Sequence, residues 1–324
     1  MKNQKIRTIL GLCCLVFTIF GWGLSFLGTK ALLVDYSPIE IIFFRYLLSF
    51  VGLFLIYPKP FLLKEWKFEL LCFLAAIFGV SIYQFLENVA IDKTSASNVS
   101  IIISCSSFFT AIFTTLILKS EKIGVNFLVG FVCSLIGVIL VSFNGTINFE
   151  FNPLGDAITF ICAIFWGLYS VTISKLNSYK YSIIHTTRRI MLYGVIQIIP
   201  MFFISGGKIE FSRFASSMNW FWILFLGILC GTLCFLTWNF SVKVLGPVKT
   251  SLAMYVQPIV TIIFGAMFFN EQIKLMGMFG ALAVIAGLFI SSTKFLDNLI
   301  KKKKKEEPKE NIEIKENEKE ELPN

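Results

Sequence analysis

The sequence is poor in charge and almost without histidine. Charged residues make up 15% of its 324 residues, whereas a soluble globular domain carries about 25%. His185 is the only histidine, which excludes a metal site built from several histidines. The eight cysteines lie inside apolar runs and contain no C-x-x-C pair, so we expect small buried packing residues rather than disulfides or zinc ligands.

Signatures of catalysis and nucleotide binding are also missing. The chain has no P-loop, no G-x-S-x-G, no H-E-x-x-H and no dinucleotide-binding fingerprint. We therefore expect no enzyme activity, no catalytic residues, no cofactor and no bound metal ion. ATP-driven pumping by this chain alone is not expected either.

Apolar residues dominate instead. They make up 56% of the chain, 36 residues are Phe, and the mean hydropathy is +0.76. A membrane-spanning helix needs about 20 mostly apolar residues, and ten such stretches can be recognised. The sequence thus predicts an all-α integral membrane protein. The ten stretches lie near residues 8–28, 38–57, 68–91, 95–118, 124–143, 154–174, 181–204, 219–241, 246–269 and 274–293.

The basic residues predict how these helices are oriented. With ten spans and a cytoplasmic N-terminus, the inside segments hold eighteen Lys and Arg residues and the outside segments hold five. The positive-inside rule then places both termini in the cytoplasm. Because the positive charge is scattered between apolar runs, we expect contact with membrane lipids and no nucleic acid. Localisation in the plasma or inner membrane follows.

The last 31 residues, 294–324, form a different kind of segment. A block of Lys is followed by Glu/Lys repeats with almost no apolar residues. Such a composition cannot bury enough surface to fold alone, so we expect a disordered cytoplasmic tail. Its lysines are suited to anionic lipid headgroups, but a solubilising flank is the simpler interpretation.

The two halves of the chain resemble each other. Trp22-Gly23-Leu24 matches Trp166-Gly167-Leu168, and Arg45 matches Arg189, both at an offset of 144 residues. We therefore predict two five-helix repeats, over 1–148 and 149–293. An odd number of spans inserts the second copy upside down, and inverted repeats are typical of transporters with a site near the midplane.

One predicted helix carries an internal proline. Pro258 lies in the ninth span and has no N–H to donate, so it leaves the carbonyl of Met254 without its helical partner. We interpret Pro258 as a gating residue. The first repeat has Phe108 at the matching position, so a proline kink is expected in only one copy.

In these features the chain resembles the drug/metabolite transporter superfamily, in its ten-helix form with two EamA domains. The resemblance covers roughly residues 8–293 and implies a solute transporter with a central cavity. It also implies export of amino acids or other small metabolites. The motifs that carry it are Trp22-Gly23, Trp166-Gly167, Pro38 with Arg45, the run from Ala90 to Ser97, Pro258 with Glu271, and Gly130, Gly137, Gly280 and Gly287.

Polar residues on two spans are candidate ligands of the solute. Ser100, Ser104 and Ser107 share one face of the fourth span, and Gln257 is the repeat mate of Ser107. Polar groups in lipid turn toward a cavity or a partner, so Ser104, Ser107 and Gln257 are predicted to bind the solute. For the serines, close helix packing is the competing interpretation.

An acid and several aromatic residues complete the predicted site. Glu87, an acid well inside a span, follows Tyr83 and Gln84; it can bind an amine or carry a coupling proton. Its place near the outer end of its helix leaves open that it is simply solvated. Aromatic side chains can surround an organic solute or an ammonium group. The other candidates are Trp22, Trp166, Tyr169, Asn239 and Tyr255.

Arg45 and Arg189 are interpreted differently, because the repeat relates them. We expect them to share a structural role, either capping carbonyls or snorkelling to the interface.

The predicted function is a secondary transporter that moves a small organic metabolite by alternating access, an amino acid or related solute in the export direction. The alternatives are an uptake carrier for a choline-like organic cation, a membrane-embedded enzyme and a channel. A proton is a candidate coupling ion. The substrate, the direction and the oligomeric state remain open at this stage.

Overall fold

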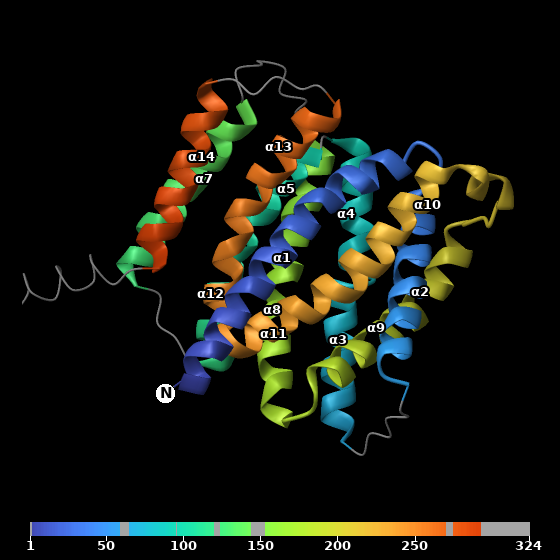
Figure 1. Ribbon diagram of the computed structural model, residues 1–324, viewed down its shortest axis with the longest axis horizontal. Coiled ribbons are helices and arrows are strands. Elements are labelled where there is room, and N and C mark those ends of the chain that lie inside the picture. The colour runs from blue at the N-terminus through green and yellow to red at the C-terminus, as the bar shows by residue number, and fades with distance from the viewer. Residues whose placement is uncertain are drawn as a thin grey trace, which may run out of the picture.

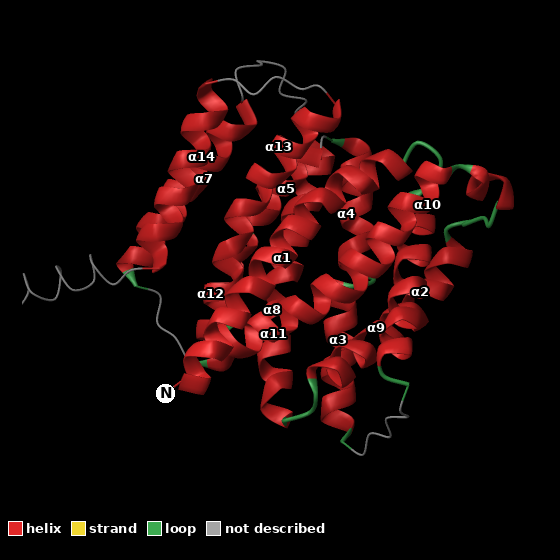
Figure 2. Cartoon of the chain, in the orientation of Figure 1, coloured by secondary structure: helices red, strands yellow, loops and turns green. Residues whose placement is uncertain are grey.

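The protein is helical throughout the part that the structure describes. This computed structural model describes residues 2–58, 65–94, 96–119, 124–143, 153–269 and 275–292, and in these ranges it contains helices and no strand (Figure 2). The boundaries predicted between the two repeats and before the tail fall in segments outside these ranges, so they stay predictions.

The first half of the chain contains five membrane-spanning segments. They consist of α1 (Lys2–Leu32); α2 (Pro38–Ile56); α3 (Trp66–Gly79) with α4 (Ile82–Lys93); α5 (Ala96–Ser104) with α6 (Ser106–Phe113) and the π-helical η1 (Thr114–Leu118); and α7 (Val125–Phe143).

The second half repeats this order. It consists of α8 (Pro153–Leu176) with η2 (Asn177–Tyr179); α9 (Ile183–Ile204); η3 (Phe211–Ala215), α10 (Ser217–Leu224), the π-helical η4 (Phe225–Cys234) and α11 (Phe235–Leu245); α12 (Pro247–Leu252), the 3₁₀-helical η5 (Ala253–Val256) and α13 (Gln257–Phe269); and α14 (Leu275–Ser292).

The ten predicted spans correspond one by one to these segments, which confirms the predicted all-α membrane fold. Among the described residues, eight helical segments are long and apolar enough to cross a bilayer, and a shorter apolar helix covers Val125–Gly137. Local signals explain where helices begin. Ser37 and Glu40 form a capping box before α2, and Pro38 stands at its first position.

The two halves run in opposite directions. In Figure 1, α1 rises from the labelled N-terminus, whereas α8, the first span of the second half, descends. The start of α1 and the end of α14 lie at the same end of the bundle. This is the inverted arrangement expected when five spans are duplicated.

The middle spans of both halves are interrupted. The third span breaks at Val80 and Ser81, and its mate, the eighth, contains the π-helical η4. The fourth span breaks at Cys105, and its mate, the ninth, tightens into the 3₁₀-helical η5. Interrupted helices in membranes occur where backbone lines a cavity or is buried in protein.

The helix interruption near Pro258 therefore has a counterpart in the first repeat, which lacks the proline. Pro258 is the second residue of α13 and follows the 3₁₀ turn. The fourth span has no proline, yet Cys105 donates to Ile102 O at 3.1 Å, a short-range bond that interrupts the helical ladder. Proline is found in only one of the two copies, as expected, but the helical hydrogen bonds are interrupted in both.

The last span of each half packs against the other. A Cβ atom added to Gly130 on α7 would lie 2.5 Å from the carbonyl oxygen of Gly287 on α14, and the reverse contact would measure 2.6 Å. The backbones therefore approach as closely as glycine allows. Figure 1 shows α7 and α14 side by side at one edge of the molecule.

Candidate functional site

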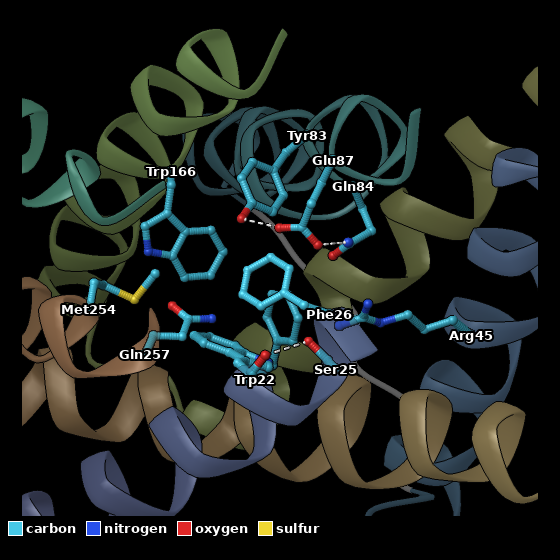
Figure 3. Close-up of a pocket in the computed structure, with 11 residues that line it drawn as sticks. Trp22, Ser25, Phe26, Arg45, Tyr83, Gln84, Glu87, Trp166, Met254 and Gln257 are labelled. Atoms are coloured by element: carbon cyan, nitrogen blue, oxygen red, sulfur yellow. Dashed lines mark hydrogen bonds between the residues drawn. The ribbon is translucent and has the colours of Figure 1, made fainter. Parts of the chain in front are cut away.

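A narrow pocket lies at the centre of the bundle, between the two repeats. The atom-free space in it measures about 280 Å³, a volume that includes open solvent. Both halves line it (Figure 3). The lining residues are Trp22, Ser25, Phe26, Arg45, Tyr83, Gln84 and Glu87 from the first half, and Trp166, Phe235, Met254 and Gln257 from the second.

The helix interruptions place several of these side chains. Tyr83, Gln84 and Glu87 stand in the first two turns of α4, directly after the break in the third span. Met254 lies in the 3₁₀ turn of the ninth span, and Gln257 begins the helix that follows. The broken segments thus bring short polar stretches to the middle of an otherwise apolar bundle.

Glu87 is buried and held by two donors. Its side chain is 5% exposed. The Tyr83 hydroxyl donates to Oε2 at 2.5 Å, and the Gln84 amide donates to Oε1. Gln84 in turn accepts from the Tyr46 hydroxyl at 3.0 Å. The structure therefore excludes the interpretation that Glu87 is simply solvated.

Arg45 enters the same pocket from α2. Figure 3 shows its side chain extending toward the cluster of rings in the pocket. It is 2% exposed, and its Nε and Nη1 have no hydrogen-bond partner among the described residues. The guanidinium lies 5.5 Å from the ring centroid of Tyr46. A side chain in this position neither snorkels to the interface nor caps a carbonyl.

The repeat mate of Arg45 has different surroundings. Arg189 forms an ion pair with Glu69, and its Nε donates to Glu69 Oε2 at 2.8 Å. Tyr193 donates to the same carboxylate oxygen at 2.7 Å. The shared structural role expected for the two arginines is therefore not observed, because within the described ranges Arg189 has a carboxylate partner and Arg45 has none.

Aromatic rings form one wall of the pocket. Trp22 and Trp166 meet edge to face with ring centroids 5.0 Å apart, and Tyr83 lies 5.1 Å from Trp166. The Trp22 indole donates to the carbonyl of Cys230 at 3.2 Å. By contrast, the indole nitrogen of Trp166 and the Oε1 atom of Gln257 have no partner in the part of the chain that the structure describes.

Five of the ten predicted ligand residues line the pocket: Trp22, Tyr83, Glu87, Trp166 and Gln257. The other five are buried but lie outside its lining. Tyr169 donates to Asn239 at 3.0 Å, and Asn239 donates to Thr187 at 2.9 Å. Tyr255 is buried in the ninth span. Tyr255 packs in a separate hydrophobic cluster with Ile101 and Phe127.

The predicted serines bond to backbone. Ser104 donates to Ile101 O at 2.6 Å, and Ser107 donates across the repeats to Ser251 O at 2.5 Å. Both hydroxyls therefore have acceptors in this conformation, which favours the helix-packing interpretation here.

Sequence reasoning did not select Ser25, Phe26, Arg45, Gln84, Phe235 and Met254. Two of these could have been found from the sequence. Gln84 stands within a turn of Glu87, and Met254 is the repeat mate of Ser104. Among the described residues, no three His, Cys, Asp or Glu side chains gather where they could bind a metal ion.

Ion pairs also join the repeats away from the pocket. Glu40, in the first turn of α2, pairs with Arg213 at 3.0 Å and accepts from Lys208 N at 2.8 Å. Glu69, in the first turn of α3, pairs with Arg189. Because α2 and α3 are consecutive antiparallel spans, these pairs lie at opposite ends of the bundle. Both are formed, so both ends are linked in this conformation.

The sequence matches the EamA-like transporter family twice, over residues 9–143 and 153–293. The chain therefore belongs to this family, which confirms the resemblance to the drug/metabolite transporter superfamily. Its two matches coincide with the two halves described above.

Relatives in other organisms are named as transporters. An uncharacterized transporter of Archaeoglobus fulgidus is 27% identical over 298 residues, covering 90% of this chain and 99% of the relative. The uncharacterized transporter YoaV of Bacillus subtilis is 23% identical over 278 residues, covering 85% and 94%. The protein is thus a multi-pass membrane transporter by family.

The fold is also found in a solved structure. A protein crystal structure matches with a TM-score of 0.68 at 14% identity, covering 88% of this chain and 95% of the other. At this identity the likeness concerns the fold alone.

Proposed function

We propose that this protein is a secondary carrier that moves a small organic solute by alternating access, with the central pocket as the solute site. One observation carries the proposal: the pocket is lined by both inverted repeats, and polar groups buried at its wall have no hydrogen-bond partner among the described residues. Two similar halves in opposite orientation allow two similar packings, one open to each side of the membrane.

The direction we propose is export of an amino acid or related metabolite, with a proton as the candidate coupling ion. Glu87 is the acid at the pocket wall that can bind an amine or carry the proton. Pro258 and the 3₁₀ turn before it are proposed to form the movable part of the ninth span. The predicted charged tail lies outside the described residues and carries no part of this proposal.

A flux assay tests the carrier function directly. The purified chain is reconstituted in liposomes preloaded with candidate unlabelled solutes, and uptake of the labelled solute is followed. A carrier gives saturable uptake that internal solute accelerates, whereas protein-free liposomes do not. Flux that rises linearly with concentration and ignores internal solute would indicate a channel instead.

The predicted orientation can be tested separately. We expect a reporter domain that works only in the cytoplasm to be active when fused to either terminus, because the predicted topology puts eighteen of the counted Lys and Arg residues on that side. A reporter that works only outside the membrane should be inactive at both positions. Fusions at the two termini that report opposite sides would contradict the predicted topology.

A choline-like cation is the second candidate substrate. The aromatic wall of Trp22, Trp166 and Tyr83 and the carboxylate of Glu87 favour it. The positive charge of Arg45 in the same pocket disfavours a cation, so the identity of the substrate depends on what Arg45 binds.

A further inference from the structure

The surroundings of Arg45 bear on the chemical class of the solute. A buried guanidinium normally has a carboxylate or several carbonyl partners, because an unpaired charge in a low-dielectric interior is costly. Arg45 is 2% exposed and has neither at Nε and Nη1 within the described ranges. The positive charge of Arg45 is therefore available to attract a molecule that enters the pocket.

The nearest acid does not neutralise Arg45 by direct contact. Glu87 interacts with Arg45 electrostatically, but its oxygens accept hydrogen bonds from Tyr83 and Gln84. In the described part of the chain, no ion pair joins Arg45 to a carboxylate. The guanidinium keeps its planar set of donors free, and this set matches the two oxygens of a carboxylate.

The second repeat shows what a structural arginine looks like in this fold. Arg189 meets Glu69 with two donors, and Tyr193 completes the group. Arg45 occupies the related position without such an acid. The difference between the mates is that, among the described residues, no carboxylate forms an ion pair with Arg45.

We propose that Arg45 binds the carboxylate group of the transported solute. This rests on the proposed carrier function and decides between its candidate substrates. A solute that carries only an ammonium group would place its charge near an unpaired guanidinium. A phosphate dianion would bring two charges close to Glu87, with one free arginine to balance them. A solute with a single carboxylate avoids both problems, because it brings one negative charge to Arg45 and no second one toward Glu87.

The opposite wall suits the rest of such a molecule. The Oε1 atom of Gln257 is an acceptor and the indole N–H of Trp166 is a donor, and both lack partners among the described residues. Figure 3 shows them across the pocket from Arg45. An amino acid could place its carboxylate on Arg45 and its amine toward Gln257 or Glu87, with its side chain among the aromatic rings.

The test compares matched solutes on the reconstituted full-length chain. Counterflow is measured for a panel of radiolabelled L-amino acids, short carboxylic acids, primary amines, quaternary ammonium compounds and phosphate monoesters. The transported compound then competes with its decarboxylated analogue. We expect the analogue to compete roughly 30-fold or more weakly, the loss typical of a buried charge pair that loses one member.

Variants locate the effect. Arg45→Gln should remove the discrimination between the solute and its decarboxylated analogue, and Arg45→Lys should restore part of it. Arg7→Gln, at an exposed arginine of α1, is the matched control and should behave as wild type. If Arg45→Gln does not fold, the wild-type competition and the Arg45→Lys variant still decide the question.

The outcomes separate the two proposals. Transport of a solute without a carboxylate, or equal competition by the decarboxylated analogue, would overturn the role of Arg45 and leave the carrier function intact. If no compound shows counterflow, thermal stabilisation of the purified protein by carboxylates is measured. Stabilisation lost in Arg45→Gln would support the site without transport, and no stabilisation would overturn both.

Discussion

Glu87 shows how one side chain gains its properties from neighbours one turn away. Tyr83 and Gln84 stand four and three residues before it on the same helix, so α4 presents all three to the pocket. Their hydrogen bonds fix the carboxyl group at the wall of the pocket. A substitution that keeps the shape and removes the charge therefore tests its role.

We expect Glu87→Gln to reduce net flux roughly 10- to 100-fold, the range for losing hydrogen bonds to a buried charged group. If Glu87 carries the coupling proton, the variant should also lose the pH dependence of flux. Flux is measured in liposomes across an imposed pH gradient. Glu65→Gln, at an exposed acid before α3, should leave both properties unchanged, and wild-type behaviour of Glu87→Gln would remove the acid from the mechanism.

At this scale, the sequence predicts residue types better than their partners. Trp22, Tyr83, Glu87, Trp166 and Gln257 could be selected because aromatic, acidic and amide side chains stand out in apolar spans. Arg45 could not, because whether an arginine finds a carboxylate depends on which helices pack together. Its match with Arg189 favoured a shared role, but only Arg189 faces Glu69.

At the scale of elements, hydropathy identified the ten spans but not the breaks within them. The third span reads as one apolar run, yet its ladder is interrupted at Val80 and Ser81. Proline marks the break in the ninth span, whereas no residue type marks the break at Cys105. Tertiary packing decides these positions, because neighbouring helices must satisfy the freed backbone groups.

The pair of closing helices offers a prediction at this scale. We expect Gly130→Ala to destabilise the protein by about 1–3 kcal/mol, the usual cost of overpacking. The added methyl group would meet the backbone oxygen of Gly287, and a backbone atom cannot rotate away. Thermal unfolding in detergent should show a lower midpoint.

Gly155→Ala is the matched control for that experiment. Its added methyl group would meet the side chain of Thr94 at 3.3 Å, a contact that small shifts can relieve. Both substitutions place alanine in a helix, so differences in helix propensity cancel. Equal midpoints for the two variants would show that α7 and α14 do not pack as closely as described.

The whole molecule is linked across its repeats at both ends. The pair Glu40–Arg213 and the pair Glu69–Arg189 each join one half to the other, and the pocket lies in the region between the halves. If the halves rock to open one side, we expect the pair at that side to separate. Removing one pair should then favour opening at its own end.

This is measured by thiol accessibility. A cysteine replaces Ser25 in a chain without the eight native cysteines, and a membrane-impermeant reagent is added to either side. We expect Arg213→Gln to raise labelling roughly 2- to 5-fold from the end that holds the α9–α10 connection, the shift produced by a modest ion pair. Glu69→Gln should raise it from the other end, and identical changes from both sides would contradict the arrangement.

The two repeats around the pocket are related to each other, but the side chains that they contribute to it differ. Arg45 and Glu87 both come from the first half, while the second half contributes aromatic, thioether and amide groups. A molecule bound there meets ionisable groups at one end only, so its half-saturation concentrations on the two faces of the membrane need not agree. Without an energy source the ratio of maximal rate to half-saturation concentration must be equal in both directions. The face that captures solute more tightly is then also the face from which turnover saturates at a lower rate.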